Sequence, residues 1–337
     1  MGSYATIIGN VLGKYRRSLV NCFWGEKMKD KVDILLSVYN PNEKYLRQQL
    51  ESLDRQTYEN IEIIVFDDCI DKRCDENIFV ECIKNKTYRI LPYKENNLGY
   101  TKAFEYLVKE STGKYVAFCD QDDIWDEYKI EKCVDCLKRE NTILVTTDRK
   151  IIDENGNIVI ESVRATSKKN YDTWKSYDDI GKYNFFTTYT VGMSMVIEGN
   201  FLRKTVPFSV YTGHDKWVTA CACACGQVSY LEEPLVSYRR HGNNVSGVLR
   251  GVSSKKEYEE ERIIPHLKLI EEFKERYPEY KGTKEALEFA YARKNHDIAK
   301  LFKYRYLAPD LAKFEILLAL VPNFVMKIVI KLLQRAI

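Results

Sequence analysis

Short apolar runs that alternate with amphipathic helical segments constrain the fold of this chain more than any other feature. The apolar runs span residues 32–38, 61–66, 87–92 and 114–119, and apolar residues recur at helical spacing over 43–56 and 100–109. Such alternation is typical of βαβ units in a parallel sheet. We therefore predict an α/β fold with a mostly parallel central sheet flanked by helices.

The second half of the chain gives shorter signals. Asp-Glu-Asn-Gly-Asn between apolar flanks predicts a hairpin over 151–160, and the residues from 161 to 185 are polar and irregular. Further strands are expected at 189–198, 228–231 and 235–238, with a helix from 213 to 225. From residue 255 onward the pattern is helical, with breaks near Pro278 and Pro322. The predicted domains are a basic segment (1–31), a large domain (32–250) and a C-terminal helical region (251–337), amphipathic in its last part.

Composition and charge exclude several classes of protein. Of 337 residues, 45% are apolar and 30% charged, which suits a globular chain rather than a disordered one. The net charge of +3 gives no general polyanion-binding signature, so we expect no nucleic-acid partner. The ten cysteines fit the paired spacing of zinc sites poorly, and residues 1–10 lack a secretory signal pattern. Free thiols in a reducing cytosol are the preferred interpretation, with a structural zinc as the weaker alternative.

Acidic residues follow two of the predicted strands: Asp67 and Asp68 after the second, and Asp120, Asp122 and Asp123 after the fourth. Ligands of parallel sheets bind beyond the carboxyl ends of the strands. Two carboxylates one residue apart can share Mg²⁺ or Mn²⁺, which prefer oxygen ligands and often complete their shell with phosphates. The alternative is a solvated turn with helix-capping Asp residues. No glycine-rich dinucleotide or P-loop motif occurs at a strand–helix junction, which argues against those sites.

Several ordered motifs cover residues 32–247. They are ILLSVYNPNEKYLRQQLESLDRQTYENIEIIVFDD, NNLGYTKAF, GKYVAFCDQDDIW, TVGMSMV, GHDKW and YRRHGNNVSG. With them the chain resembles the inverting family 2 glycosyltransferases, which have the nucleotide-diphospho-sugar transferase (GT-A) fold. FCDQDDIW, GHDKW and YRRHGNNVSG look most like bacterial rhamnosyltransferases of cell-surface polysaccharide assembly. The chain departs from the family at Cys69-Ile70, where Gly-Ser is usual.

The resemblance implies roles for the residues of a nucleotide site. Ser37, Tyr39 and Asp68 match positions that hold the nucleotide base, and Asp68 would accept the base imide N–H, with Asp67 supporting it. Gly99, in the NNLGY turn, joins this nucleotide-binding set. Because uracil and thymine share one imide edge, a single Asp suits either base.

The resemblance also implies a metal pair and a general base. Asp120 and Asp122 match the Asp-x-Asp pair, with Asp122 as the direct ligand of Mn²⁺ or Mg²⁺ and Asp120 facing both the ribose and the metal. His241 is a further candidate ligand, of the metal or of the diphosphate. Asp215, in GHDKW, matches the base that takes the proton of the acceptor hydroxyl.

Three more residues have two interpretations each. His214 either orients Asp215 or lies at the surface near a helix start. Arg239 and Arg240 either donate charge-assisted hydrogen bonds to phosphate or lie in solvent.

These residues fit one chemistry. Displacement of a nucleoside diphosphate leaves charge that a divalent cation neutralises, and a carboxylate must take the acceptor's proton. We expect a metal-dependent inverting glycosyltransferase that uses dTDP-L-rhamnose and acts on a hydroxyl of a cell-surface polysaccharide or lipid-linked oligosaccharide. The alternatives are a UDP-hexose or UDP-galactofuranose transferase, a sugar nucleotidyltransferase, and a non-catalytic binding module.

The C-terminal stretch 311–333 is strongly apolar but is interrupted by charges and Pro322. It does not reach the about 18–20 uninterrupted apolar residues of a spanning helix. Residues 300–337 carry seven basic and two acidic side chains, so an amphipathic helix on anionic lipid is favoured. The alternatives are docking on the protein's own core and a homodimer contact. The expected location is the cytoplasmic face of a bacterial plasma membrane.

Overall fold

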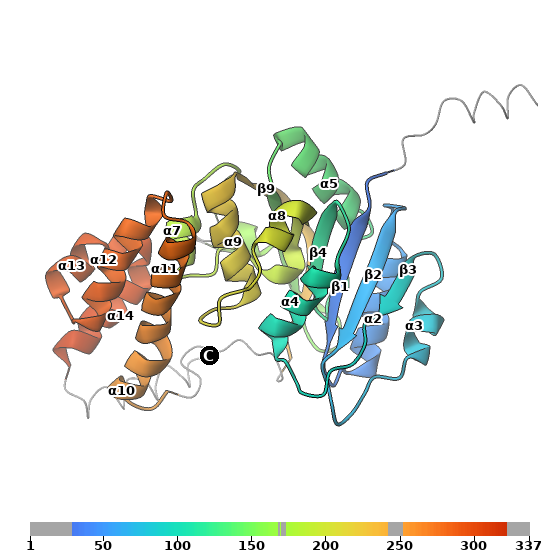
Figure 1. The fold of residues 1–337 in the computed structure, drawn as a ribbon, viewed down its shortest axis with the longest axis horizontal. Coiled ribbons are helices and arrows are strands. Elements are labelled where there is room, and N and C mark those ends of the chain that lie inside the picture. Colours follow the sequence, from blue (N-terminus) through green and yellow to red (C-terminus); the bar gives the residue numbers. More distant parts are fainter. Residues whose placement is uncertain (1–28, 168, 170–172, 242–251, 322–337) are drawn as a thin grey trace, which may run out of the picture.

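A nine-stranded sheet forms the centre of the molecule (Figure 1). The structure is a computed structural model, and it describes residues 29–167, 169, 173–241 and 252–321. The strands are β1 (Val32–Val38), β2 (Ile61–Asp67), β3 (Thr87–Ile90), β4 (Tyr115–Cys119), β5 (Ile124–Trp125), β6 (Leu144–Ile152), β7 (Ile158–Ile160), β8 (Met195–Glu198) and β9 (Val228–Arg239). Their order is β3-β2-β1-β4-β8-β6-β9-β5, with β7 paired to β6.

The sheet is mixed. Strands β3, β2, β1 and β4 are parallel, as the alternation of strands and helices predicts. Strand β8 is antiparallel to both β4 and β6, whereas β9 is parallel to β6 and antiparallel to β5. The α/β class with flanking helices is therefore confirmed, and the parallel character belongs to the half of the sheet built by the first four predicted strands.

Helices occur at the predicted ranges 43–56, 100–109 and 213–225 and after residue 255, whereas the helices at 77–82 and 129–140 and the short ones within 161–185 were not predicted. They are α2 (Glu43–Asp54), α3 (Asn77–Cys82), α4 (Tyr100–Glu110), α5 (Lys129–Glu140), α6 (Val163–Thr166), α7 (Gly181–Asn184), α8 (Gly199–Lys204), α9 (His214–Cys225), α10 (Lys255–Tyr258), α11 (Ile264–Arg276), α12 (Gly282–Lys294), α13 (Ile298–Lys303) and α14 (Pro309–Leu320). A π-turn, η3 (Glu259–Ile263), joins α10 to α11, and 3-10 turns occur at η2 (Gly192–Ser194) and η4 (Arg305–Leu307). Helix α2 begins where the Asn42 side chain accepts a hydrogen bond from the Tyr45 amide at 3.3 Å.

Two strand predictions after residue 185 were wrong. The expected strand 189–198 is only Met195–Glu198, because Gly192–Ser194 forms a turn whose glycine packs against His214. A Cβ at Gly192 would lie 2.7 Å from His214 Nε2. The expected strands 228–231 and 235–238 are one strand, β9, whose register shifts around the pair of Asp148 and Pro234. Proline has no N–H to donate to the ladder, which explains the irregularity. The hairpin over 151–160 is confirmed as β6 and β7.

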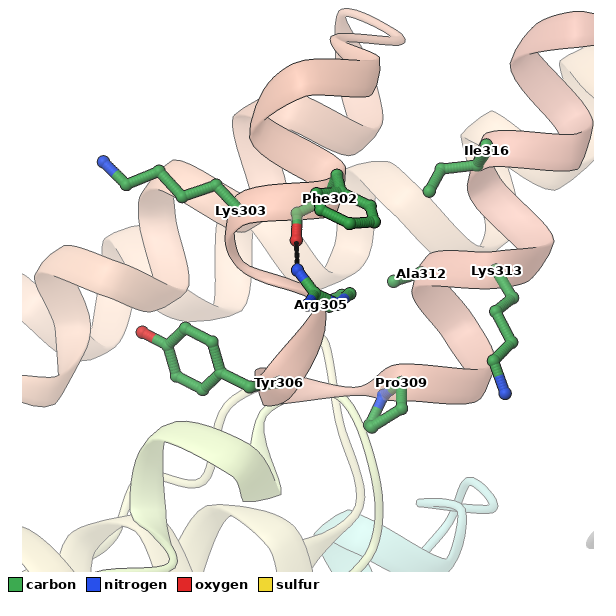
Figure 2. Close-up of a pocket in the computed structure, with 8 residues that line it drawn as sticks. All are labelled: Phe302, Lys303, Arg305, Tyr306, Pro309, Ala312, Lys313 and Ile316. Carbon is green, nitrogen blue, oxygen red and sulfur yellow. Dashed lines mark hydrogen bonds between the residues drawn. The ribbon is translucent and has the colours of Figure 1, made fainter.

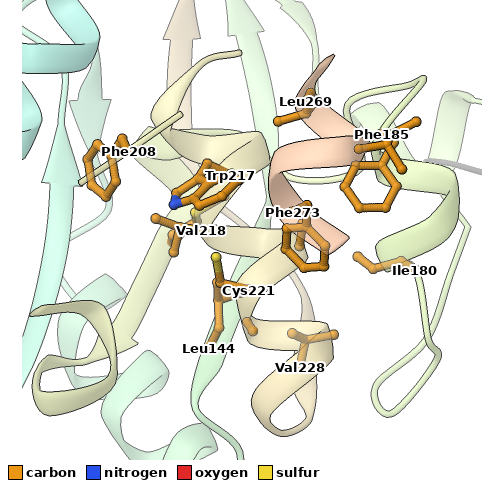
Figure 3. Packing of buried hydrophobic residues seen from close by; sticks show 14 of the residues in the cluster. Leu144, Ile180, Phe185, Phe208, Trp217, Val218, Cys221, Val228, Leu269 and Phe273 are labelled. Carbon is orange, nitrogen blue, oxygen red and sulfur yellow. The ribbon is translucent and has the colours of Figure 1, made fainter. Parts of the chain in front are cut away.

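Two buried hydrophobic clusters cover the two faces of the sheet, because successive strand residues point to opposite sides. Ile34 belongs to one cluster and Leu35 to the other. The larger cluster continues from the sheet through Trp217 of α9 to Phe273 of α11, whose rings lie 5.7 Å apart (Figure 3). It extends to Ala312 of α14. The C-terminal helices therefore pack on the sheet domain, and the predicted boundary at residue 250 lies outside the described residues.

Helices α11–α14 form the end of the molecule opposite β3 (Figure 1). Helix α14 docks on this layer through Ala312, Glu315 and Leu318, all buried. The carboxylate of Glu315 accepts a 2.8 Å hydrogen bond from Arg293, and both side chains are fully buried. None of the helices that the structure describes is long and apolar enough for a membrane span. Pro322 and the rest of the apolar stretch lie outside the described residues.

Candidate active site

The loop after β4 carries Asp120, Asp122 and Asp123 and is fixed to the loop after β1. The side chain of Gln121 accepts a hydrogen bond from the Tyr39 amide at 2.8 Å and donates one to the Tyr39 carbonyl at 3.1 Å. Strands β1 and β4 are parallel neighbours, so their carboxyl ends meet at one edge of the sheet. Sequence reasoning missed Gln121, although its place inside Asp-x-Asp-Asp marked it.

The end of β9 lies across this acidic loop. Strand β5 follows the loop directly and is antiparallel to β9, with Ile124 opposite Ser237. That register carries His241 to the loop, where its Nε2 lies 2.8 Å from Oδ2 of Asp122. The structure therefore brings together two of the three candidate metal ligands, which are 119 residues apart in the sequence.

Arg239 holds the loop that carries Asp122 and Asp123 in place. Its Nε donates to the Asp122 carbonyl at 2.9 Å, and its other nitrogens donate to the Asp153 carbonyl at 3.3 Å and to Gln48 Oε1 at 2.7 Å. Its backbone amide donates to Asp123 Oδ1 at 3.0 Å. The Arg239 side chain has no exposed surface. Both sequence interpretations of Arg239, as a phosphate contact and as a solvated cation, were therefore wrong. Arg240 is exposed, so both interpretations stay open for that residue.

Asp215 lies close enough to the acidic loop to influence it. Burial, followed by the charges of Asp122 and Asp215, raises the pKa of Asp120 to about 7. Three carboxylates from two distant parts of the chain thus share one region of negative potential. The charge of Lys129 opposes this shift, and a divalent cation or a proton would further relieve the repulsion.

The atoms near Asp122 suit such a cation. Two adjacent ligands of an octahedral Mg²⁺, each at about 2.1 Å, lie about 3 Å apart. Asp122 Oδ2 and His241 Nε2 form a hydrogen bond at 2.8 Å. This separation is close to that of two neighbouring ligands of one ion, so a bound cation would take the place of the hydrogen bond. Among the described residues no group of three His, Cys, Asp or Glu could hold a metal. Solvent and phosphate oxygens are further ligands that such an ion accepts.

Asp215 lies in the first turn of α9, as predicted, and its Oδ1 accepts a hydrogen bond from the Lys216 amide at 2.7 Å. Gly213 precedes the helix, and a Cβ there would lie 2.8 Å from Asp215 Oδ1 and 3.6 Å from the Tyr100 hydroxyl. Glycine thus leaves room for both groups. Tyr100 is 54% exposed beside the candidate base. Sequence reasoning did not single it out, although it directly follows Gly99 in the NNLGY turn.

His214 is buried rather than at the surface, so the surface interpretation was wrong. Its ring packs against Phe104 at 4.1 Å and Phe118 at 4.6 Å between centroids. Neither ring nitrogen has a hydrogen-bond partner among the described residues. Burial lowers the pKa of His214 to about 4, which keeps the imidazole neutral. His214 anchors the first turn of α9, which carries Asp215.

Asp68 organises the turn that precedes α4. Its Oδ1 accepts the Leu98 amide and its Oδ2 the Gly99 amide, both at 2.8 Å. Gly99 has φ +76°, a conformation that favours glycine. Asp67 accepts the Cys69 and Cys74 amides at 2.9 and 2.7 Å and so shapes the neighbouring turn.

The remaining predicted nucleotide residues lie at the end of β1. Ser37 is half-buried in the last part of the strand, opposite Phe66 of β2. Tyr39 follows the strand and is 56% exposed. Both lie at the same edge of the sheet as Asp68 and the acidic loop, so the structure gathers the whole predicted set there. The individual base contacts of Ser37, Tyr39, Asp68 and Gly99 stay predictions.

Lys129 is a buried cation that sequence reasoning missed. Its Nζ donates to the Met193 carbonyl at 2.7 Å and lies over the Trp125 ring. Burial lowers the pKa of Lys129 to about 7. A lysine on the buried face of amphipathic helix α5 was the available signal.

The overall architecture is similar to solved structures. The structure of S. aureus TarS residues 1–349 in complex with UDP-GlcNAc aligns with a TM-score of 0.54 at 16% identity and covers 84% of this chain and 82% of that one. This likeness defines the fold class, an α/β protein with the GT-A fold.

Sequence comparison identifies the family. The pattern of the family described as "Glycosyl transferase family 2" matches residues 33–197. An uncharacterized glycosyltransferase of Methanocaldococcus jannaschii is 31% identical over 221 residues, which are 64% of this chain and 72% of that protein. One of Nostoc sp. is 26% identical over 64% of this chain and 66% of its own length. The chain belongs to glycosyl transferase family 2 and is a glycosyltransferase.

Proposed function

We propose that this glycosyltransferase moves a sugar from a nucleoside-diphosphate donor to an acceptor hydroxyl with inversion, assisted by Mn²⁺ or Mg²⁺. The observation that carries the proposal is the convergence of Asp122, His241 and Asp215 at the carboxyl edge of the sheet. The raised pKa of Asp120, caused by burial and then by the charges of Asp122 and Asp215, supports the closeness of the three carboxylates. A site of this kind combines charge neutralisation with proton removal.

Asp122, His241 and Asp120 act on the donor, and Asp215 acts on the acceptor. Asp122 and His241 would hold the cation, which when bound neutralises the charge of the departing diphosphate. Asp120 would face the ribose and the cation. Asp215 takes the proton of the acceptor hydroxyl while that oxygen forms its bond to the anomeric carbon. Because the hydroxyl attacks from the face opposite the leaving diphosphate, the configuration inverts without a covalent sugar–enzyme intermediate.

The donor proposed for the first trial is dTDP-L-rhamnose, with Asp68 accepting the base imide N–H and Ser37, Tyr39 and Gly99 lining the nucleotide site. Support comes from FCDQDDIW, GHDKW and YRRHGNNVSG, which look most like rhamnosyltransferases. The UDP-GlcNAc complex of TarS supports the alternative of a UDP-sugar such as a UDP-hexose or UDP-galactofuranose. A sugar nucleotidyltransferase is disfavoured because Ser-Val-Tyr-Asn-Pro replaces a glycine-rich loop after β1.

The proposed acceptor is a growing surface polysaccharide or a lipid-linked oligosaccharide. Such an acceptor would place the enzyme at the cytoplasmic face of a bacterial plasma membrane. The excess of basic residues over 300–337 supports attraction to anionic lipid.

The test is a thermal-shift panel of nucleotide sugars with and without Mn²⁺, because a ligand that binds only the folded state stabilises it according to its affinity. Asp122→Asn should abolish turnover and remove the metal-dependent part of the donor shift. The exposed Asp71, in the loop after β2, provides the matched control as Asp71→Asn. A metal-dependent donor shift in Asp122→Asn as large as that of the wild type would contradict the metal assignment.

A further inference from the structure

A cavity of about 650 Å³ opens on the C-terminal helices, among residues that have no role in the candidate active site. It lies between α13, η4 and α14 (Figure 2) and is lined by Phe302, Lys303, Arg305, Tyr306, Pro309, Ala312, Lys313 and Ile316. Its walls are therefore mainly aromatic and aliphatic, with three cations among them. A catalytic role is not indicated, since no carboxylate or histidine lines it.

The cations lie around an apolar centre. Figure 2 shows Lys303 and Lys313 on either side of Arg305. The Arg305 guanidinium stacks 3.9 Å from the Phe302 ring centroid and donates to the Phe302 carbonyl at 2.6 Å. Among the described residues, neither Lys303 nor Arg305 has a carboxylate within 4.0 Å, whereas Lys313 lies 3.7 Å from the exposed Asp310. The cavity therefore has a net positive rim.

One face of α14 extends the apolar surface. Lys313, Ile316, Leu317 and Leu320 recur at the spacing of a single helix face, and Leu317 and Leu320 are 43% and 67% exposed. The opposite face carries the buried Ala312, Glu315 and Leu318. On α13, Phe302 is 58% exposed. Exposed apolar side chains beside Lys and Arg are the composition of a membrane-interface surface.

We propose that this surface, residues 302–320, binds the anionic phospholipid leaflet of a membrane. Lys303, Arg305 and Lys313 contact the headgroup phosphates, and Phe302, Leu317 and Leu320 enter the interfacial region. The proposal rests on the proposed function only in that a lipid-linked acceptor calls for membrane contact. A second copy of the chain fits less well, because a two-fold contact would set the same cations against each other.

The test is cosedimentation of the full-length protein with phosphatidylglycerol-containing vesicles, compared with phosphatidylcholine vesicles. A basic residue near an anionic surface contributes about 1 kcal/mol, or about fivefold, so Lys303→Gln/Lys313→Gln should lower the partition coefficient about 25-fold. Raising the salt from about 0.1 to 1 M, which shortens the Debye length from about 10 to 3 Å, should release the wild type. Lys44→Gln/Arg55→Gln, which removes two exposed charges of the α2 region, is the charge-matched control and should bind as the wild type does.

A second variant tests the apolar part. Phe302→Ser removes a ring that is already half exposed, so the fold should survive, and vesicle binding should fall about tenfold. Equal binding to both vesicle types, or equal losses in Lys303→Gln/Lys313→Gln and the α2 control, would overturn the proposal. So would a dimer in sedimentation velocity that these variants dissociate while vesicle binding stays unchanged. Donor hydrolysis measured without vesicles separates the two proposals, because its absence in the wild type contradicts the proposed function and leaves the vesicle result standing.

Discussion

Arg239→Met is the substitution that tests most directly how the acidic loop is built. Methionine keeps an unbranched apolar stem but removes the three side-chain hydrogen bonds to the Asp122 carbonyl, the Asp153 carbonyl and Gln48, at 2.9, 3.3 and 2.7 Å. These bonds are partly buried, and leaving such acceptors unpaired costs about 1–1.5 kcal/mol each, at the low end of the range for buried groups. The sum is about 3–5 kcal/mol. For a chain of 337 residues, with an unfolding entropy of about 2.1 cal/mol/K per residue, this corresponds to a fall in melting temperature of about 4–7 °C.

The same substitution should affect the cation site. The Asp122 carbonyl is held by Arg239, and the Asp122 side chain lies beside His241. Loss of the guanidinium therefore loosens the loop that positions the proposed ligands. The Mn²⁺-dependent shift in melting temperature should shrink, while the metal-independent part of nucleotide binding should remain.

Arg240→Met provides the matched control, because Arg240 is the next residue but has an exposed side chain. It should change the melting temperature and the Mn²⁺-dependent shift little. Differential scanning fluorimetry with and without Mn²⁺ measures both quantities on both variants. An Arg239→Met protein with wild-type stability and an unchanged Mn²⁺ response would refute the reasoning.

Three further predictions concern the base, the pH response and the C-terminus. Asp215→Asn should lower transfer about 10²–10⁴-fold with nearly unchanged donor affinity, measured by kinetics and calorimetry; a parallel loss of donor affinity would move Asp215 to the donor site. Burial raises the pKa of Glu105, but the hydrogen bonds from Lys109, Lys102 and the Phe208 amide outweigh burial and lower the pKa overall. The stabilisation from Glu105 is therefore present above the unfolded value near 4.5 and is lost as the pH falls through the folded value. Glu105→Gln should remove this pH dependence from the urea midpoint. Deleting 311–337 leaves Arg293 buried without Glu315 and should cost about 3–5 kcal/mol; a wild-type melting temperature would contradict the docking of α14.

The parts of the fold that the sequence predicts are those with a local period. Strand β1 has the predicted bounds, and α9 begins and ends within one residue of the prediction. The position of Asp120 and Asp122 also followed from a local rule, since strand ends of a parallel sheet share one edge. Local patterns cannot report which distant side chains meet. The burial of Arg239 depends on the antiparallel register of β5 and β9, and the turn at Gly192 depends on the His214 ring beneath it.

The contacts also connect the nucleotide end of the site to the catalytic end. Asp68 holds the Gly99 amide, and Tyr100 follows Gly99 as the first residue of α4. The Tyr100 hydroxyl lies beside Gly213, which in turn leaves room for the Asp215 carboxylate. Glycine suits position 99 because of its φ of +76°, and position 213 because a Cβ there would lie 2.8 Å from Asp215 Oδ1. A short series of contacts through the 97–99 turn, Tyr100 and Gly213 therefore links the proposed base-binding residues to the proposed general base.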